Sequence, residues 1–150
     1  MEFKILSTDS GNADFHKLIR LLDEDLGNRY GEVQKEYARY NKVDFLADVV
    51  VIYLNDSPVA CGAFKGFDTE TVELKRIFVQ PEARGQGLGK LLVQELETKA
   101  RSKGYSHAVL ETGLKQLEAI GLYKKCGYHV IANYEPYVGM ENSVCMKKAL

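Results

Sequence analysis

The sequence predicts a single mixed α/β domain spanning residues 1–150, and three observations lead to this prediction. First, residues 48–79 contain three apolar, β-branched runs separated by short turns, which is the pattern of an antiparallel meander. Second, helical and strand-like stretches alternate after Pro81, as they do around a sheet with parallel strands. Third, a glycine-rich stretch joins the two halves between a strand and a helix. The chain is long enough to bury one core without disulfides or metals.

The first half is expected to contain a strand, one or two helices and then the meander. Residues 2–7 alternate polar and apolar side chains, which suits a short strand. From Ala13, apolar residues recur at steps of three and four and indicate a helix that ends at Gly27–Asn28. These apolar residues are Phe15, Leu18, Ile19, Leu22 and Leu26. A second short helix is predicted over Gly31–Tyr40, and the meander strands over Asp48–Leu54, Val59–Phe67 and Thr71–Val79.

The second half is expected to alternate helices with strands. Apolar positions from Leu88 to Ala100 form one helical stripe, and the helix should end at Lys103–Gly104. The next strand, Ser106–Glu111, should run parallel to the last meander strand because a helix crosses between them. Thr112–Gly113 should break that strand. A short helix over Gln116–Lys125 follows, with Leu117, Ile120 and Tyr123 on its apolar face, and two final strands are predicted over Tyr128–Tyr134 and Ser143–Lys148.

Composition and charge exclude several classes of protein. The chain has 20 basic and 21 acidic residues without a block of one sign, so neither nucleic acid nor a membrane surface is an expected partner. No apolar stretch approaches the roughly 20 residues of a membrane span, and the N-terminus lacks a secretory pattern. The odd number of cysteines without C-x-x-C spacing, and the widely separated histidines, predict no disulfide framework and no metal site. These residues are Cys61, Cys126, Cys145, His16, His107 and His129. We therefore expect a cytoplasmic protein with a small-molecule or peptide partner.

The glycine-rich stretch Arg84–Lys90 is suited to bind a phosphate group. Its three glycines alternate with Gln86 and Leu88 where a helix should begin, so several amides can point into one volume that the helix dipole also favours for anions. A Walker A loop is excluded because the glycine spacing is one residue short and Leu91 replaces the magnesium-binding hydroxyl. The dinucleotide-binding pattern fits poorly, because Lys90 stands at its third glycine.

Two motifs resemble the signatures of the GCN5-related N-acetyltransferase (GNAT) family. Arg84, Gly87 and Gly89 match the loop signature Arg/Gln-x-x-Gly-x-Gly/Ala. Residues 119–128 match a second signature, A-x-x-L-Y-x-x-x-G-[FY]. The resemblance runs from about residue 45 to the C-terminus and is specific in residues 73–90 and 116–128. It implies a central, mostly antiparallel sheet of six to seven strands with a splayed parallel pair, flanked by about four helices.

The resemblance also implies acetyl-CoA as the acyl donor. In this family the loop binds the pyrophosphate, and the pantetheine arm lies between two central strands that splay apart just before the loop. The implied cofactor-binding residues are Ile77, Phe78, Val79, Arg84, Gly85, Gln86, Gly87, Leu88, Gly89, Lys90, Gln116 and Tyr123. Among them, the backbone N–H of Val79 is the implied oxyanion donor. Gln116 stands where the family often has Asn, and can offer an amide with a longer reach.

Two side chains are candidates for proton transfer. Glu73 lies six residues before Val79, an even spacing that predicts both side chains on one strand face, and it matches a position from which a carboxylate acts as base in some family members. The alternative is that Glu73 forms a structural ion pair with Lys75 or Arg76. Tyr123 matches the family tyrosine that approaches the cofactor sulfur, where a phenol can protonate the departing thiolate. The alternative is that it only packs on pantetheine.

We therefore expect an N-acetyltransferase that moves the acetyl group of acetyl-CoA to a primary amine of a small molecule, amino acid or peptide, by direct attack through a tetrahedral intermediate. A catalytically silent acyl-CoA-binding regulatory module is the alternative, which the presence of both Glu73 and Tyr123 disfavours. The amine is not predicted. Five tyrosines could line its pocket or serve in packing: Tyr30, Tyr37, Tyr40, Tyr134 and Tyr137. A homodimer through the last strands is compatible with the sequence.

Overall fold

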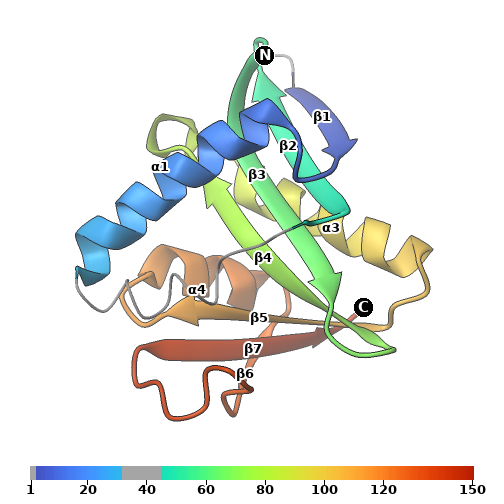
Figure 1. The fold of residues 1–150 in the computed structure, drawn as a ribbon, viewed down its shortest axis with the longest axis vertical. Helices are drawn as coiled ribbons and strands as arrows, with labels where there is room; N and C mark the ends of the chain where they lie inside the picture. Colours follow the sequence, from blue (N-terminus) through green and yellow to red (C-terminus); the bar gives the residue numbers. More distant parts are fainter. Residues whose placement is uncertain (1–2, 32–44) are drawn as a thin grey trace.

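In the computed structural model, which describes residues 3–31 and 45–150, seven strands form one sheet with helices on both faces (Figure 1). The strands are β1 (Phe3–Thr8), β2 (Asp48–Leu54), β3 (Ser57–Gly66), β4 (Thr71–Val79), β5 (His107–Gly113), β6 (His129–Ile131) and β7 (Ser143–Ala149). The helices are α1 (Ala13–Tyr30), α3 (Leu88–Ser102) and α4 (Leu117–Lys125), with a 3₁₀ turn, η1, at Pro81–Ala83. The strand order is β1-β2-β3-β4-β5-β7-β6. The predicted mixed sheet with one parallel pair, β4 and β5, is confirmed.

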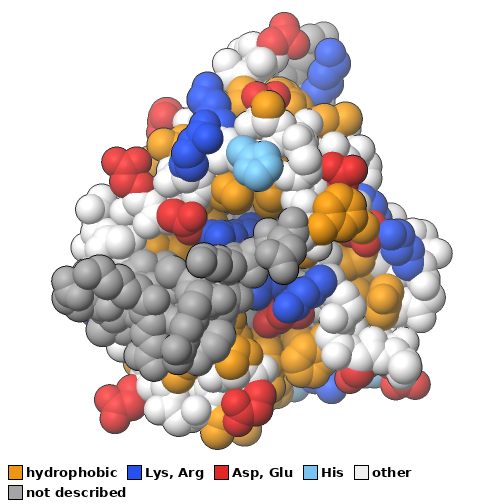
Figure 2. Space-filling model, in the orientation of Figure 1, with side chains coloured by type: hydrophobic (Ala, Val, Ile, Leu, Met, Phe, Trp, Pro, Cys, Tyr) orange, Lys and Arg blue, Asp and Glu red, His pale blue; other side chains and the backbone are white. Residues whose placement is uncertain are grey.

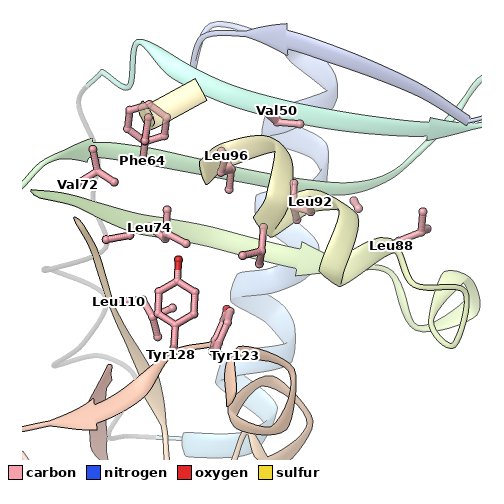
Figure 3. Close-up of a cluster of buried hydrophobic side chains, with 14 of the residues drawn as sticks. Val50, Phe64, Val72, Leu74, Leu88, Leu92, Leu96, Leu110, Tyr123 and Tyr128 are labelled. Atoms are coloured by element: carbon pink, nitrogen blue, oxygen red, sulfur yellow. The ribbon is translucent and has the colours of Figure 1, made fainter. Parts of the chain in front are cut away.

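The core has two layers, one on each face of the sheet. We call the buried side chains beneath α3 and α4 the α3-side core and those beneath α1 the α1-side core. Leu92 and Leu96 of α3 point onto the sheet in the α3-side core (Figure 3). Alternate residues of β2 join opposite layers, Val50 the α3-side core and Val51 the α1-side core, so this strand is covered on both faces.

Helix α1 begins as predicted but ends later. The Asn12 side chain caps it by accepting a hydrogen bond from the Phe15 N–H at 2.9 Å. The helix continues past Gly27 to Tyr30, and Gly31 ends it with a φ of 56° while its N–H bonds the Gly27 carbonyl. The predicted end at Gly27–Asn28 was therefore wrong. Apart from Gly31, the second helix predicted over Gly31–Tyr40 lies outside the described residues, as do Tyr37 and Tyr40.

The parallel strands β4 and β5 pair over four residues only and then diverge. The pairs run from Thr71 opposite His107 to Leu74 opposite Leu110, although both strands continue beyond this point. The predicted splay is present, but it begins at Lys75 rather than just before the loop. A wedge-shaped gap therefore opens between the carboxyl-terminal ends of β4 and β5, where open α/β sheets bind ligands.

A β-bulge in β4 lies where this gap begins. Arg76 has a positive φ of 59°, and the pairing with β3 jumps from Lys75 to Phe78. Arg76 and Ile77 therefore stand opposite one residue of β3, Gly62. A side chain at Gly62 would put its Cβ 2.9 Å from a Leu96 methyl of α3, so this glycine allows α3 to pack closely on the sheet.

The bulge reverses the alternation of side chains along β4. Val72 and Leu74 belong to the α3-side core, so Glu73 between them points to the opposite face. Beyond the bulge, Val79 packs against the α3-side core, although it lies an even number of residues from Glu73. The prediction that Glu73 and Val79 share a strand face was therefore wrong.

The carboxyl-terminal elements occur in the predicted order but differ in extent. Thr112–Gly113 belongs to β5 and does not break it, and β6 covers only three residues of the predicted strand Tyr128–Tyr134. In α4, Tyr123 is buried as expected, whereas Leu117 is 73% exposed because the helix begins at the surface. Acidic and basic side chains are interspersed on the described part of the face in Figure 2. Within the described ranges, no helix is long and apolar enough to cross a membrane.

Candidate active site

The loop between β4 and α3 presents a row of backbone amides. Gly85 and Gly87 have φ values of 82° and 79°, and Gly87 is the N-cap of α3. No acceptor in the described part of the chain takes a hydrogen bond from the amides of residues 85–90. Gly89 allows α4 to approach, since a Cβ there would lie 2.8 Å from a Leu122 methyl. The loop is thus able to bind an anion at a helix N-terminus.

A groove of about 530 Å³ extends from this loop along the end of β4 and the side of α4. We call it the loop groove. Its lining contains all the predicted cofactor-binding residues except Gln86, whose side-chain amide instead donates to the Ala83 carbonyl at 3.3 Å. The sequence did not predict the lining residues that α1 and the outer part of α4 contribute. These are Leu22, Asp25, Glu118, Ala119, Gly121, Leu122 and Lys125.

The Arg84 side chain and the Val79 backbone meet at the start of the groove. Arg84 Nε donates a hydrogen bond to the Val79 carbonyl at 2.9 Å, which holds the guanidinium against the loop. The Gln80 N–H bonds the Val59 carbonyl of β3. Because backbone groups alternate in direction along an antiparallel strand, the Val79 N–H points away from β3, towards the gap between β4 and β5. This orientation suits the predicted oxyanion donor.

A second, smaller cavity of about 80 Å³ is lined by β4 and β5 where the two strands separate. We call it the β4–β5 cavity. It carries charged and phenolic side chains from both strands and from the segment before β7: Glu73, Lys75, Arg76, Glu111 and Tyr137. Leu22, Ile77, Gln116 and Tyr123 line both this cavity and the loop groove. The two spaces therefore meet at Ile77 and Tyr123.

Tyr123 projects from α4 into this junction. Its side chain is 6% exposed and its ring packs edge-on against Tyr128, with the centroids 6.1 Å apart. Burial raises the pKa of the Tyr123 phenol. The hydroxyl is therefore protonated at neutral pH and can act as a hydrogen-bond donor.

Glu73 is buried and already has protein partners. It is 6% exposed, and its carboxylate accepts a hydrogen bond from the Tyr134 hydroxyl at 2.8 Å. Lys75 Nζ lies 3.8 Å from the carboxylate and Lys65 Nζ lies 3.9 Å from it. Desolvation by burial lowers the pKa of Lys75. The structural pairing of Glu73 with Lys75, which the sequence left open, is therefore present.

Gln116 links the end of β5 to the start of α4. Its side-chain oxygen accepts hydrogen bonds from the Gly113 N–H at 2.9 Å and the Thr112 hydroxyl at 3.2 Å. Since its carbonyl is engaged in this way, the amide nitrogen is the group that Gln116 can offer to a cofactor.

Glu111 is the functional candidate that the sequence did not suggest. It lies in β5, is partly buried, and lines the β4–β5 cavity. Burial raises the pKa of its carboxyl to about 7, and the hydrogen bond from the Ser143 hydroxyl, 2.8 Å away, opposes this shift. One signal in the sequence could have identified it: Glu111 is the last residue of the predicted strand, at the edge where a parallel pair offers its ligand site.

The end of α1 is fastened to the loop before α4. Arg29 forms an ion pair with Glu118 and donates a hydrogen bond to the Lys115 carbonyl at 3.1 Å. The Tyr30 hydroxyl accepts the Lys115 N–H at 3.1 Å and lies against Gly113, where a Cβ would clash. Tyr30 thus braces the two elements. Of the other described tyrosines expected near a pocket, Tyr137 lines the β4–β5 cavity and Tyr134 binds Glu73.

Comparison with known proteins gives a family match over most of the chain. Residues 15–128 match the model of the acetyltransferase (GNAT) family. An IAA acetyltransferase of Azospirillum brasilense is 36% identical over 140 residues, which cover 89% of this chain and 89% of that protein. Among the described residues, no group of three or more His, Cys, Asp or Glu side chains is placed to hold a metal ion.

Solved structures share the fold over nearly the whole chain. A Klebsiella pneumoniae protein assigned to the acyl-CoA N-acyltransferases is 30% identical, with a TM-score of 0.82 over 99% of this chain and 97% of that one. A GNAT acetyltransferase of Elizabethkingia anophelis with acetyl-CoA bound is 20% identical, with a TM-score of 0.72 over 99% and 98%. The second similarity concerns the fold alone.

Proposed function

The chain belongs to the acetyltransferase (GNAT) family, and from this premise we propose that it transfers the acetyl group of acetyl-CoA to a primary amine bound in the β4–β5 cavity. The observation that carries the proposal is the junction at Tyr123. The loop groove, with its row of available amides at one end, meets the β4–β5 cavity at this residue. The cavity is lined by the carboxylates of Glu73 and Glu111. The donor could therefore reach this point along the groove and the acceptor through the cavity.

In the proposed complex, the amides of residues 85–90 bind the pyrophosphate and the pantetheine arm follows the gap between β4 and β5. The thioester carbonyl accepts the Val79 N–H, which stabilises the oxyanion as the amine nitrogen attacks. The carbon–sulfur bond then breaks, and the Tyr123 hydroxyl donates to the departing thiolate. A carboxylate of the β4–β5 cavity takes the proton of the attacking amine.

Binding and turnover test this function separately. We expect acetyl-CoA and CoA to bind in isothermal titration calorimetry and ATP not to bind, because the loop lacks the Walker A glycine spacing and its magnesium-binding hydroxyl. We also expect free thiol to be released from acetyl-CoA when one or more amines of a panel of spermidine, tyramine, lysine and phenylalanine are added. Failure to bind either form of the coenzyme would contradict the proposal. Binding with no amine-dependent thiol release from any acceptor would instead favour the acyl-CoA-binding module.

A further inference from the structure

We propose that Glu111, and not Glu73, is the carboxylate that takes the proton from the acceptor amine. The inference rests on the proposed function and assigns one step of it. It replaces the prediction from the sequence, which gave this role to Glu73.

The position of Glu111 in the sheet is the first argument. Leu110 forms the last parallel pair with β4, so Glu111 is the first β5 residue beyond the point where the strands separate. Leu110 packs in the α3-side core, and Glu111 therefore points to the opposite face, into the β4–β5 cavity. Glu73 lies one pair before the point of separation, opposite Val109. Of the two carboxylates, Glu111 is thus the one that lies beyond the point where β4 and β5 separate.

The partners of the two carboxylates are the second argument. The Glu73 carboxylate accepts the Tyr134 hydroxyl on one oxygen and has the ammonium groups of Lys65 and Lys75 within 4 Å of the other. Both of its oxygens are therefore already engaged by protein groups. The Glu111 carboxylate accepts a hydrogen bond from the Ser143 hydroxyl and lies with Tyr123 on the wall of the same cavity. Its protonation removes a charge from a buried site.

The surroundings of Glu111 set its proton affinity near neutrality. The titratable or charged groups that line its cavity are Glu73, Lys75 and Arg76 from β4, Tyr123 from α4 and Tyr137 from the segment before β7. Cys145 of β7 lies directly opposite it in the sheet. Burial raises the pKa of Glu111 to about 7, Lys75 lowers it and the charge of Glu73 raises it. A proton acceptor works best when its pKa is close to the working pH.

The acceptor enters as an ammonium ion, and one N–H bond breaks as an O–H bond forms on the Glu111 carboxylate, which leaves a neutral amine to attack the thioester. When the intermediate collapses, the nitrogen loses a second proton, which restores the Tyr123 hydroxyl after its proton has gone to the thiolate. Glu111 then releases its proton to solvent. The equilibrium constant for the first transfer, from an ammonium group of pKa ~10.4, is about 10⁻³ when the acid has a pKa of ~7. It is about 10⁻⁶ for an ordinary glutamate with a pKa near 4.3. The raised proton affinity of Glu111 therefore increases the equilibrium fraction of neutral amine formed by this transfer about 10³-fold.

Three conservative variants test this assignment: Glu111→Gln, Glu73→Gln and Ser143→Ala. The rate of thiol release is measured against pH with acetyl-CoA and the fastest amine of the panel. We expect Glu111→Gln to lower kcat by about 10²- to 10⁴-fold and to abolish the acid limb of the profile near pH 7. Glu73→Gln should mainly raise KM and keep that limb, moved to lower pH because the charge of Glu73 raises the pKa of Glu111. Ser143→Ala should shift the limb to higher pH, since the lost hydrogen bond stabilises the carboxylate.

A second readout needs no acceptor. In the free wild-type protein carrying ¹³C-labelled glutamate carboxyls, one resonance should titrate near pH 7, be absent in Glu111→Gln and persist in Glu73→Gln. The assignment is overturned if no such resonance exists, if Glu73→Gln removes it, or if Glu111→Gln retains both kcat and the acid limb. Calorimetry separates this failure from failure of the proposed function, because the coenzyme would still bind in the first case and would not bind in the second.

Discussion

At the scale of single residues, Tyr123 and Tyr128 form a pair that separates a chemical role from a packing role. Both rings are buried and lie in edge-on contact. The Tyr128 hydroxyl donates to Glu97 at 2.9 Å, away from the loop groove, whereas Tyr123 lines both the groove and the β4–β5 cavity. The two phenols are therefore matched in burial and differ in access to the proposed substrates.

We expect Tyr123→Phe to lower turnover by roughly 10- to 1000-fold with little change in the affinity for acetyl-CoA, because it removes only the donor to the thiolate. Tyr128→Phe is the control. It should lower the free energy of unfolding by about 1–3 kcal/mol, through loss of a buried hydrogen bond to a charged group, and leave turnover nearly unchanged. Steady-state kinetics and urea denaturation of both variants provide the comparison. Equal turnover in wild type and Tyr123→Phe would remove this residue from the mechanism.

Glu111 also makes the stability of the protein depend on pH. Its carboxyl has a pKa of about 7 in the folded state and an ordinary value of 4.5. Below about pH 4.5 the group is protonated in both states, and above about pH 7 it is ionised in both, so the folded state then holds a buried charge. Wild-type stability should fall across this window by an amount on the order of 3 kcal/mol.

Glu111→Gln keeps the neutral form at every pH and should not lose this stability. We therefore expect the difference in unfolding free energy, variant minus wild type, to become more positive between about pH 5 and pH 8. Urea titrations at several pH values measure it, with Glu73→Gln as the comparison. A difference that stays constant across the range would show that Glu111 ionises normally in the folded protein.

The wrong prediction that Glu73 and Val79 share a strand face shows what residue spacing cannot predict. An even separation from Val79 indicates a shared face only if the strand is regular, and the bulge at Arg76 breaks that regularity. No glycine or asparagine marks this position, although a positive φ usually favours such residues. The strain at Arg76 is imposed by tertiary packing and cannot be deduced from the local sequence.

At the scale of elements, the loop between β4 and α3 depends on glycines in the left-handed region. The sequence predicted both ends of β4 and the start of α3 correctly, because glycine spacing, Pro81 and apolar periodicity are local signals. The extent of α1 was not predictable in the same way. Its last turn is held by contacts of Arg29 and Tyr30 with residues more than 80 positions away.

Gly85 and Gly104 allow the role of the loop to be tested against a matched control. Both have a positive φ, 82° and 93°, and a Cβ at either would meet nothing within 4 Å. Alanine should therefore cost each site about 1–2 kcal/mol of stability for the left-handed conformation. Only Gly85→Ala should also weaken acetyl-CoA binding, by about tenfold or more, since the added Cβ covers the amides. Equal affinities of the two variants in calorimetry would show that this loop does not hold the coenzyme.

At the scale of the whole molecule, the sheet is two pieces joined along a short parallel seam. Strands β1–β4 carry α1, and β5–β7 form the other piece, with four residue pairs between β4 and β5. The contacts of Arg29 and Tyr30 with Lys115 and Glu118 fasten the two pieces across the open end. The family motifs predicted this architecture, but the acceptor side depends on contacts between distant segments and had no local signal.

The most direct test of the account is a crystal structure of the protein with acetyl-CoA. We expect pyrophosphate oxygens within hydrogen-bonding distance of the amides of residues 85–90, the thioester carbonyl at the Val79 N–H and the sulfur beside the Tyr123 hydroxyl. A coenzyme bound elsewhere, or side chains filling the gap between β4 and β5 in the complex, would contradict it.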